Sequence, residues 1–196
     1  MQESLPLATI HTAVLEFLRD REDVVLFGAQ AVNAYVPEPR MTQDIDLFAI
    51  QAAAFAEELR NYLGERFHIA MRVRDIGDAK GYRLYQVQKA GNRHLVDIRP
   101  VEQLPPAKRI ERILVIEPAD LIALKVIAYH QRRGQPKSGT DWRDLAMLLL
   151  AFPDLKQEEG AVAKRLQAMG ATAEAMAAWR ELVKQEIQKP EEDNEF

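Results

Sequence analysis

Cysteine is absent from this 196-residue chain, which excludes disulfide bonds, zinc sites built on thiolates and a thiol nucleophile. Histidine is scarce, and its four copies are scattered without the spacing of a metal-binding motif. No run of about 18 apolar residues occurs, and the N-terminus lacks a basic segment followed by an apolar one. The sequence therefore predicts a soluble, cytoplasmic protein that does not enter a membrane.

The net charge is small, at −4, which does not favour a general nucleic-acid binder. The charge is unevenly distributed, because residues 71–112 carry ten lysines and arginines against five acids. The last seven residues, in contrast, carry four acids. The internal basic segment could bind a polyanion, or it could form an ordinary solvated surface of mixed charge. The sequence leaves both interpretations open.

The order of the expected elements divides the chain into two parts. In the first part we expect helices at 5–20, 29–36 and 52–63, and strands at 23–27, 44–49, 67–73, 82–87, 94–98 and 113–116. Gly64 would end the third helix as a C-cap. From 117 onward the pattern is helical, with helices expected at 118–132, 141–151, 158–168 and 172–188. We therefore expect an α+β fold, in which a mixed sheet flanked by helices (1–116) precedes a helical bundle (117–190) and a disordered acidic tail (191–196).

Residues 24–48 hold the strongest chemical signal. A short apolar run ends at Gly28, and a second strand then carries Asp44 and Asp46. Alternation with period two places both carboxylates on one face of that strand. Aspartate is depleted in strands, and a divalent cation held between the two carboxylates is the simplest reason to keep them together. The alternative is an edge strand whose acids face solvent.

Residues around these carboxylates could bind phosphate. Gly28 and Ala29 open a helix, where backbone N–H groups can approach an anion closely, although an ordinary strand-to-helix turn would have the same sequence. Arg40 could contact a triphosphate through two parallel hydrogen bonds, or it could be a surface arginine after a proline-rich turn. Thr42 lies between Arg40 and the strand of carboxylates.

Lys125 and two later acids form a second candidate group. The helical neighbours of Lys125 are largely apolar, so its ammonium either extends to water or points into a cleft at a bound anion. Asp141 and Asp144 share a helical face and could serve the same site. They could also be ordinary acids of a first helical turn, with Ser138 and Asp141 forming a variant of a capping box.

Together these motifs resemble the nucleotidyltransferase superfamily that is built on a polymerase-β-type palm. In that superfamily a strand ends at a glycine, a helix follows, and an Asp-x-Asp pair precedes a third carboxylate on a neighbouring strand. Asp97, between two apolar residues, fits the third position. The chain is most similar to the AbiEii-type toxin nucleotidyltransferases. Their helical lysine and their two acids three residues apart correspond to Lys125 and to Asp141 and Asp144.

The resemblance implies an enzyme that moves an NMP from an NTP to a hydroxyl acceptor, with Mg²⁺ or Mn²⁺ as cofactor, and releases pyrophosphate. The residues that would bind metal and perform catalysis are Asp44, Asp46 and Asp97. The residues that would bind nucleotide are Gly28, Ala29, Arg40, Thr42, Lys125, Asp141 and Asp144. The basic segment suggests RNA, such as the end of a tRNA, as the acceptor, and an antitoxin protein is a further expected partner.

A non-catalytic relative that binds nucleotide or a partner protein is the alternative. The family often has serine or glycine where Ala29 stands, and basic residues where Ser138 and Thr140 stand. These differences remove a hydroxyl group and two cations from the expected site. The three aspartates favour the enzyme.

Overall fold

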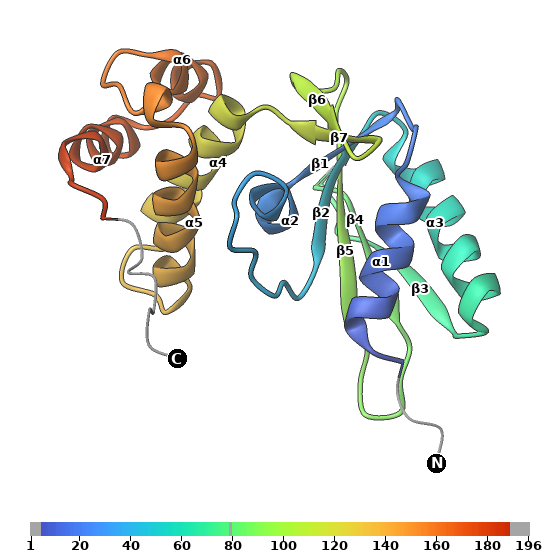
Figure 1. Cartoon of the computed structure of the whole chain (residues 1–196). Helices are drawn as coiled ribbons and strands as arrows, with labels where there is room; N and C mark the ends of the chain where they lie inside the picture. The colour runs from blue at the N-terminus through green and yellow to red at the C-terminus, as the bar shows by residue number, and fades with distance from the viewer. Residues whose placement is uncertain (1–4, 79, 189–196) are drawn as a thin grey trace. The chain divides into compact units, whose positions relative to one another are not determined.

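A seven-stranded mixed sheet is the centre of the first part of this computed structural model, which describes residues 5–78 and 80–188. The chain divides after Glu117 into two units, each with its own buried apolar residues. The predicted α+β class is confirmed, because strands and helices are mixed in the first unit and the described part of the second is helical (Figure 1). The predicted acidic tail, residues 191–196, lies outside the described residues.

The first unit places the two strands that carry the aspartates side by side. In chain order, its elements are α1 (Leu7–Phe17), β1 (Val24–Phe27), α2 (Gly28–Asn33), β2 (Ile45–Ala49), α3 (Ala52–Phe67), β3 (Met71–Asp75), β4 (Tyr82–Gln86), β5 (Arg93–Pro100), β6 (Ala107–Ile110) and β7 (Ile113–Ile116). The strands lie in the order β3-β4-β5-β2-β1-β7-β6. Strand β2 runs antiparallel to β1 and parallel to β5, so Asp46 and Asp97 lie on neighbouring strands.

Helices cover the two faces of this sheet differently. Figure 1 shows α1 and α3 on one face of the sheet and α2 on the opposite face. Along β2 the burial alternates: Ile45 and Leu47 are completely buried, whereas Asp46 between them is partly exposed. This is the alternation that the sequence predicted, and it directs the aspartate away from the apolar layer.

Helix α3 continues past the glycine that was expected to end it. Gly64 lies inside the helix, which ends at Phe67 with His68 in the left-handed conformation (φ 52°) as its C-cap. The strand predicted at 67–73 therefore begins only at Met71. A glycine inside a helix costs about 1 kcal/mol relative to alanine, and the burial of the preceding apolar side chains outweighs this cost.

Strand β6 was missed by the sequence analysis. The segment follows Pro105-Pro106, which indicates a connection, and it contains the adjacent basic residues Lys108 and Arg109. It pairs antiparallel with β7 at the edge of the sheet. Charged side chains are common on edge strands, because one side of such a strand faces solvent.

The described part of the second unit forms α4 (Pro118–Gln131), α5 (Lys137–Ala151), a 3₁₀ turn (Pro153–Leu155), α6 (Ala161–Ala168) and α7 (Ala173–Lys184). Helix α5 begins four residues before its predicted start at Asp141. No side chain caps its N-terminus, so the capping box expected at Ser138 is wrong. Within residues 5–78 and 80–188, no helix combines the length and the apolar character needed to cross a membrane.

Candidate functional site

Two parallel neighbouring strands bring the predicted carboxylates together. Asp46 of β2 and Asp97 of β5 are register partners, and Asp44 immediately precedes β2. Register partners on adjacent strands project from the same face. One ligand atom from each of Asp44, Asp97 and His94 can be chosen so that all three lie within 4.8 Å of one another. The first unit therefore gathers two of its predicted acids, Asp44 and Asp97, around a histidine that was not predicted, and Asp46 is the register partner of Asp97 on the neighbouring strand.

His94 was not predicted as a site residue. It lies three positions before Asp97, and residues an odd number of positions apart project from opposite faces of a regular strand. The β4–β5 ladder is irregular here: successive residues of β4 pair with Val96 and with His94, which leaves Leu95 as the extra residue of a β-bulge. The bulge turns His94 toward the carboxylates. Leu95 and Val96 are both buried, and two adjacent apolar residues in an otherwise alternating strand were the signal that could have indicated the bulge.

Gly28 makes room for one of the carboxylates. Its φ of +69° lies in the left-handed region, and a Cβ atom added to it would stand 2.0 Å from Oδ2 of Asp46. A side chain at this position would therefore have to displace the carboxylate. Gly28 and Ala29 are the first two residues of α2, so the start of this helix lies directly against Asp46.

Two basic side chains lie against Asp97. Nε of Arg83 donates a hydrogen bond to Oδ1 at 2.8 Å, and Nε2 of His94 lies 3.4 Å from the same oxygen. Burial raises the pKa of Asp97, but His94 and Arg83 outweigh burial and hold that pKa below its usual value. Asp97 in turn raises the pKa of His94, against the effect of burial. Asp97 is therefore ionised at neutral pH, which is the state that a metal ligand requires.

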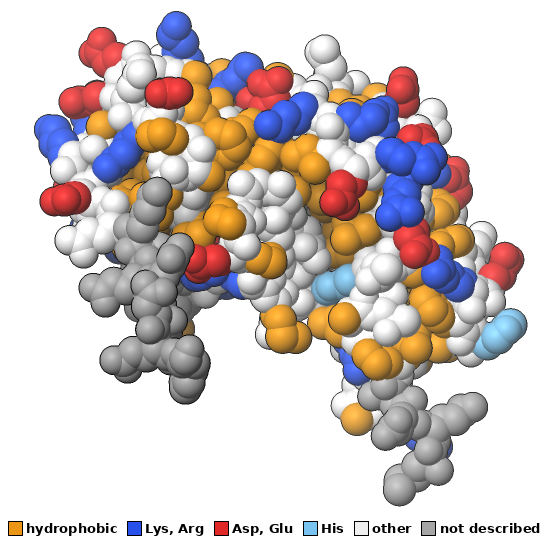
Figure 2. Space-filling view, viewed as in Figure 1, with side chains coloured by type: hydrophobic (Ala, Val, Ile, Leu, Met, Phe, Trp, Pro, Cys, Tyr) orange, Lys and Arg blue, Asp and Glu red, His pale blue; other side chains and the backbone are white. Residues whose placement is uncertain are grey.

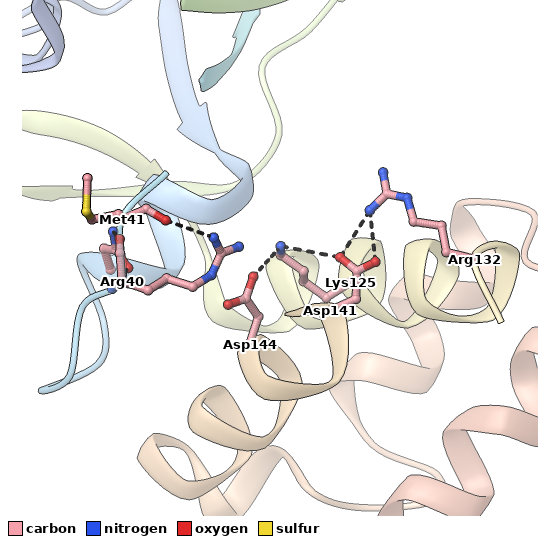
Figure 3. Close-up of polar contacts among 7 residues, drawn as sticks. Arg40, Met41, Lys125, Arg132, Asp141 and Asp144 are labelled. Atoms are coloured by element: carbon pink, nitrogen blue, oxygen red, sulfur yellow. Dashed lines mark hydrogen bonds and ion pairs between the residues drawn. The ribbon is translucent and has the colours of Figure 1, made fainter. Parts of the chain in front are cut away.

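Asn33 fixes the loop that carries Arg40 and Thr42. Its side-chain amide donates to the carbonyl oxygen of Arg40 at 2.8 Å and accepts from the Arg40 backbone N–H at 3.0 Å. The Arg40 guanidinium donates to the Met41 carbonyl oxygen at 3.2 Å (Figure 3). Thr42 is buried, and its hydroxyl has no hydrogen-bond partner within the described ranges. Because an unsatisfied buried hydroxyl is costly, a ligand that bonded to it would be favoured.

In the second unit Lys125 lies in a buried network of ion pairs (Figure 3). Its Nζ donates to Oδ2 of Asp144 at 2.7 Å and lies 3.9 Å from Oδ1 of Asp141. Asp141 also accepts two hydrogen bonds from Nη1 of Arg132. The Lys125 side chain is only 10% exposed, so it does not extend to water. The three residues that the resemblance assigned to one site do lie together, and the acids hold the ammonium in place.

A row of basic side chains leads from Asp97 to the edge of the sheet. Arg74 of β3 pairs with Arg83 of β4, and Arg83 pairs with Asp97 of β5. Arg72 pairs with Tyr85 in the next row. Because cross-strand partners share a face, these side chains lie on the face of the carboxylates, and the two arginines of β3 are exposed.

Other parts of the surface carry mixed charge. On the face shown in Figure 2, lysines and arginines are interspersed with aspartates, glutamates and apolar side chains. That face presents no broad patch of one sign, in line with the small net charge of −4. The row on the sheet is therefore a local feature, set by strand register.

The predicted site residues fall into two groups, one in each unit. The group of the first unit consists of Gly28, Ala29, Arg40, Thr42, Asp44, Asp46 and Asp97. The group of the second unit consists of Lys125, Asp141 and Asp144. The roles of these residues in binding and catalysis stay predictions.

Comparison with known proteins gives one family match. A family model described as "Nucleotidyl transferase AbiEii toxin, Type IV TA system" matches residues 12–195, so the resemblance drawn from the motifs is confirmed. No curated protein matches the sequence.

Solved structures share the fold at low sequence identity. The Megavirus polyadenylate synthase is 13% identical, with a TM-score of 0.59 over 75% of this chain and 32% of the synthase. This chain thus spans about a third of that protein's length. The Helicobacter pylori protein JHP933 is 15% identical, with a TM-score of 0.60 over 85% of this chain and 75% of that protein.

Proposed function

Because the chain belongs to the AbiEii nucleotidyltransferase toxin family, it is a nucleotidyltransferase, and we propose that it moves an NMP from an NTP to a hydroxyl group of RNA with Mg²⁺ or Mn²⁺ as cofactor. One observation carries the proposal: Asp44, Asp97 and His94 converge within 4.8 Å. Asp46 lies on the same face, with its carboxylate over Gly28. Carboxylates gathered in this way repel one another, and a divalent cation held between them would relieve that repulsion.

The residues of this site fit a divalent cation. Carboxylate oxygens are the ligands that Mg²⁺ and Mn²⁺ prefer, and Asp97 is ionised because its pKa is lowered by His94 and Arg83 despite burial. Nε2 of His94 is buried and has no hydrogen-bond partner in the described part of the chain. Asp44, Asp46 and Asp97 would hold the ion. When bound, such an ion neutralises charge on the transferring phosphoryl group and activates the attacking hydroxyl.

The other predicted residues would position the nucleotide. Gly28 and Ala29 would present backbone N–H groups to phosphate, and the Thr42 hydroxyl would donate the hydrogen bond that it does not make within the described residues. Arg40 and Lys125 would bind phosphate oxygens as cations. The two aspartates beside Lys125 would act indirectly, by holding its ammonium in one position.

Metal and nucleotide should stabilise the protein together, because a ligand that binds only the native state raises the free energy of unfolding. At a ligand concentration of 100 times Kd the gain is about 2.7 kcal/mol. We expect MgCl₂ or MnCl₂ with an NTP to raise Tm in differential scanning fluorimetry. Asp44→Ala and Asp46→Ala should abolish the rise and leave the protein folded, whereas Asp154→Ala, an exposed aspartate of the second unit, should preserve it.

Two features favour the alternative of a non-catalytic relative: Ala29 lacks a side-chain hydroxyl, and Ser138 and Thr140 stand where the family has basic residues. Isothermal titration calorimetry separates the two functions. If the wild-type protein bound NTP equally well with a divalent cation and with EDTA, the metal-dependent enzyme would lose its support and the non-catalytic relative would be favoured.

The face of the sheet that carries the carboxylates supports RNA as the acceptor. The row of Arg74 and Arg83 ends at Asp97, and Arg72 lies beside it on the same strand as Arg74. A chain of phosphates could follow these cations, with a terminal hydroxyl near the carboxylates. The ionised Asp97 could then accept the proton of that hydroxyl.

Removing two of these cations should weaken RNA binding and reduce its dependence on salt. Each phosphate contact on single-stranded RNA contributes roughly −0.7 to the slope of log K against log salt concentration. Arg72→Gln/Arg74→Gln should therefore lower the magnitude of the slope by about 1.4. Fluorescence anisotropy with a labelled single-stranded RNA across a salt series measures both quantities.

The control for this experiment is Arg60→Gln/Arg66→Gln on α3, which removes the same charge from the opposite face of the sheet. It should leave the slope unchanged. Equal slopes in the β3 variant and the wild-type protein would exclude this face as the RNA platform, and would move the proposal to a small-molecule or protein hydroxyl.

The family description assigns these proteins to type IV toxin–antitoxin systems. We extend the proposal accordingly: this chain acts as a toxin in the cytoplasm, where both NTP and RNA are present, and an antitoxin protein is the partner that counteracts it.

A further inference from the structure

His94 adds a nitrogen ligand to a site that is otherwise made of carboxylates. Its Nδ1 lies 3.5 Å from Oδ2 of Asp44, and its Nε2 lies 3.4 Å from Oδ1 of Asp97. Ligands bound to one ion at about 2.1 Å lie no more than about 4.2 Å apart. The ligand atoms of these three residues, all within 4.8 Å of one another, need only small side-chain movements to meet that condition.

The backbone places His94 here through an irregularity of the sheet. Without the extra residue Leu95, the side chain of His94 would project from the opposite face to that of Asp97. Bulges next to active sites commonly re-aim a side chain. The ring also packs against Tyr85, with centroids 5.2 Å apart, which limits its orientations. His94 is thus positioned by two neighbouring strands.

A role as a simple counter-ion explains the contacts of His94 less well. Asp97 already accepts a hydrogen bond from Arg83 at 2.8 Å, so a second cation is not needed at that oxygen. The contact between Nε2 and Asp97 has the length of an ion pair without the geometry of a hydrogen bond, and Nε2 is buried with no hydrogen-bond partner among the described residues. In the neutral form of the ring, a nitrogen in this position is available to a metal ion.

We propose that His94 is a metal ligand, and that the resulting set of nitrogen and oxygen ligands makes this site prefer Mn²⁺ to Mg²⁺. The inference rests on the proposed function, because it concerns the metal of the same site. Both ions favour carboxylate oxygen, but Mg²⁺ is bound almost entirely by oxygen, whereas Mn²⁺, as a first-row transition-metal ion, also accepts an imidazole nitrogen. In protein metal sites the second ring nitrogen of such a histidine commonly donates to a carboxylate, and Asp44 and Asp97 stand on the two sides of this ring.

The test uses the full chain with MnCl₂ alone. Electron paramagnetic resonance of free Mn²⁺ gives the affinity, competition with MgCl₂ gives the ratio of the two affinities, and electron spin-echo modulation reports nitrogen bound to Mn²⁺. His94→Asn replaces the nitrogen with an oxygen ligand. His68→Asn is the matched control, since His68 is exposed at the end of α3 and has a positive φ that asparagine tolerates.

Wild type and His68→Asn should show ¹⁴N modulation from one imidazole, and His94→Asn should not. The ratio of Mn²⁺ to Mg²⁺ affinity should fall about tenfold or more in His94→Asn. Even the loss of a residue that only hydrogen-bonds to a metal ligand lowers metal affinity by about 10–100-fold. Suppose that Asp44→Ala abolished Mn²⁺ binding, but that wild type showed no ¹⁴N modulation and His94→Asn had the same ratio of Mn²⁺ to Mg²⁺ affinity as wild type. The inference would then be overturned, and the metal-dependent function would stand. If wild type bound no Mn²⁺ that depends on Asp44, both would be overturned.

Discussion

Replacing Gly28 with alanine should lower the rate of nucleotidyl transfer by about a hundredfold, because misplacement of a reacting group by about 1 Å has that effect. The added Cβ would stand 2.0 Å from Oδ2 of Asp46, so the carboxylate must move away from its position over the helix start. The left-handed conformation adds a cost of about 1–2 kcal/mol to the free energy of folding. Steady-state kinetics and urea denaturation measure the two effects separately.

Gly170→Ala is the matched control for this substitution. Gly170 has the same φ of +69°, but nothing lies within 4 Å of the position of its Cβ. The control should therefore lose a similar amount of stability through backbone strain and keep its activity. Equal activities of the two variants would show that the contact between Gly28 and Asp46 does not matter for the reaction.

Lys125→Met should lower the free energy of unfolding by about 3–5 kcal/mol, the cost of removing one partner of a buried ion pair. Asp144 is completely buried and would lose the ammonium that lies 2.7 Å away. Asp141 would keep its hydrogen bonds from Arg132. Lys164→Met, an exposed lysine on α6, should change the stability by less than about 0.5 kcal/mol. Urea denaturation followed by circular dichroism measures both variants.

A double-mutant cycle with Asp144→Asn separates this ion pair from a role in nucleotide binding. If the pair is structural, Lys125→Met/Asp144→Asn should recover much of the stability lost in Lys125→Met. If Lys125 also binds phosphate, the double variant should still bind NTP about 10-fold or more weakly, since a charge-assisted hydrogen bond contributes about 1.5–3 kcal/mol. Unchanged stability in Lys125→Met would contradict the ion-pair network of the structure.

The sequence predicted which side chains share a face of the sheet where the strands are regular. Period-two alternation assigned Asp46 to the face opposite Ile45 and Leu47, and both apolar residues are buried. The same rule failed at His94, because a bulge changes the period and a bulge depends on pairing with a strand that is distant in sequence.

The surroundings of Lys125 show a second limit of sequence reasoning. Its helical neighbours indicated an apolar environment, yet its closest contacts are two acids on α5. Which side chain meets Lys125 depends on how two helices pack, and helical spacing within one element carries no information on that packing. The extension of α3 past Gly64 has a similar cause, since tertiary burial outweighed a local C-cap signal.

The central claim is that the carboxylates of β2 and β5 perform metal-dependent nucleotidyl transfer to RNA, and transfer of radiolabel tests it most directly. The protein is incubated with each of four α-³²P-labelled NTPs, Mg²⁺ or Mn²⁺, and total RNA, and the label in RNA is measured. Wild type should label RNA with at least one NTP, EDTA should stop the labelling, and Asp46→Asn and Asp97→Asn, which keep the shape of the side chains, should reduce it at least about a hundredfold. Labelling that persisted unchanged in Asp46→Asn and Asp97→Asn, or a wild-type protein that labelled no RNA with any NTP and either ion, would contradict it.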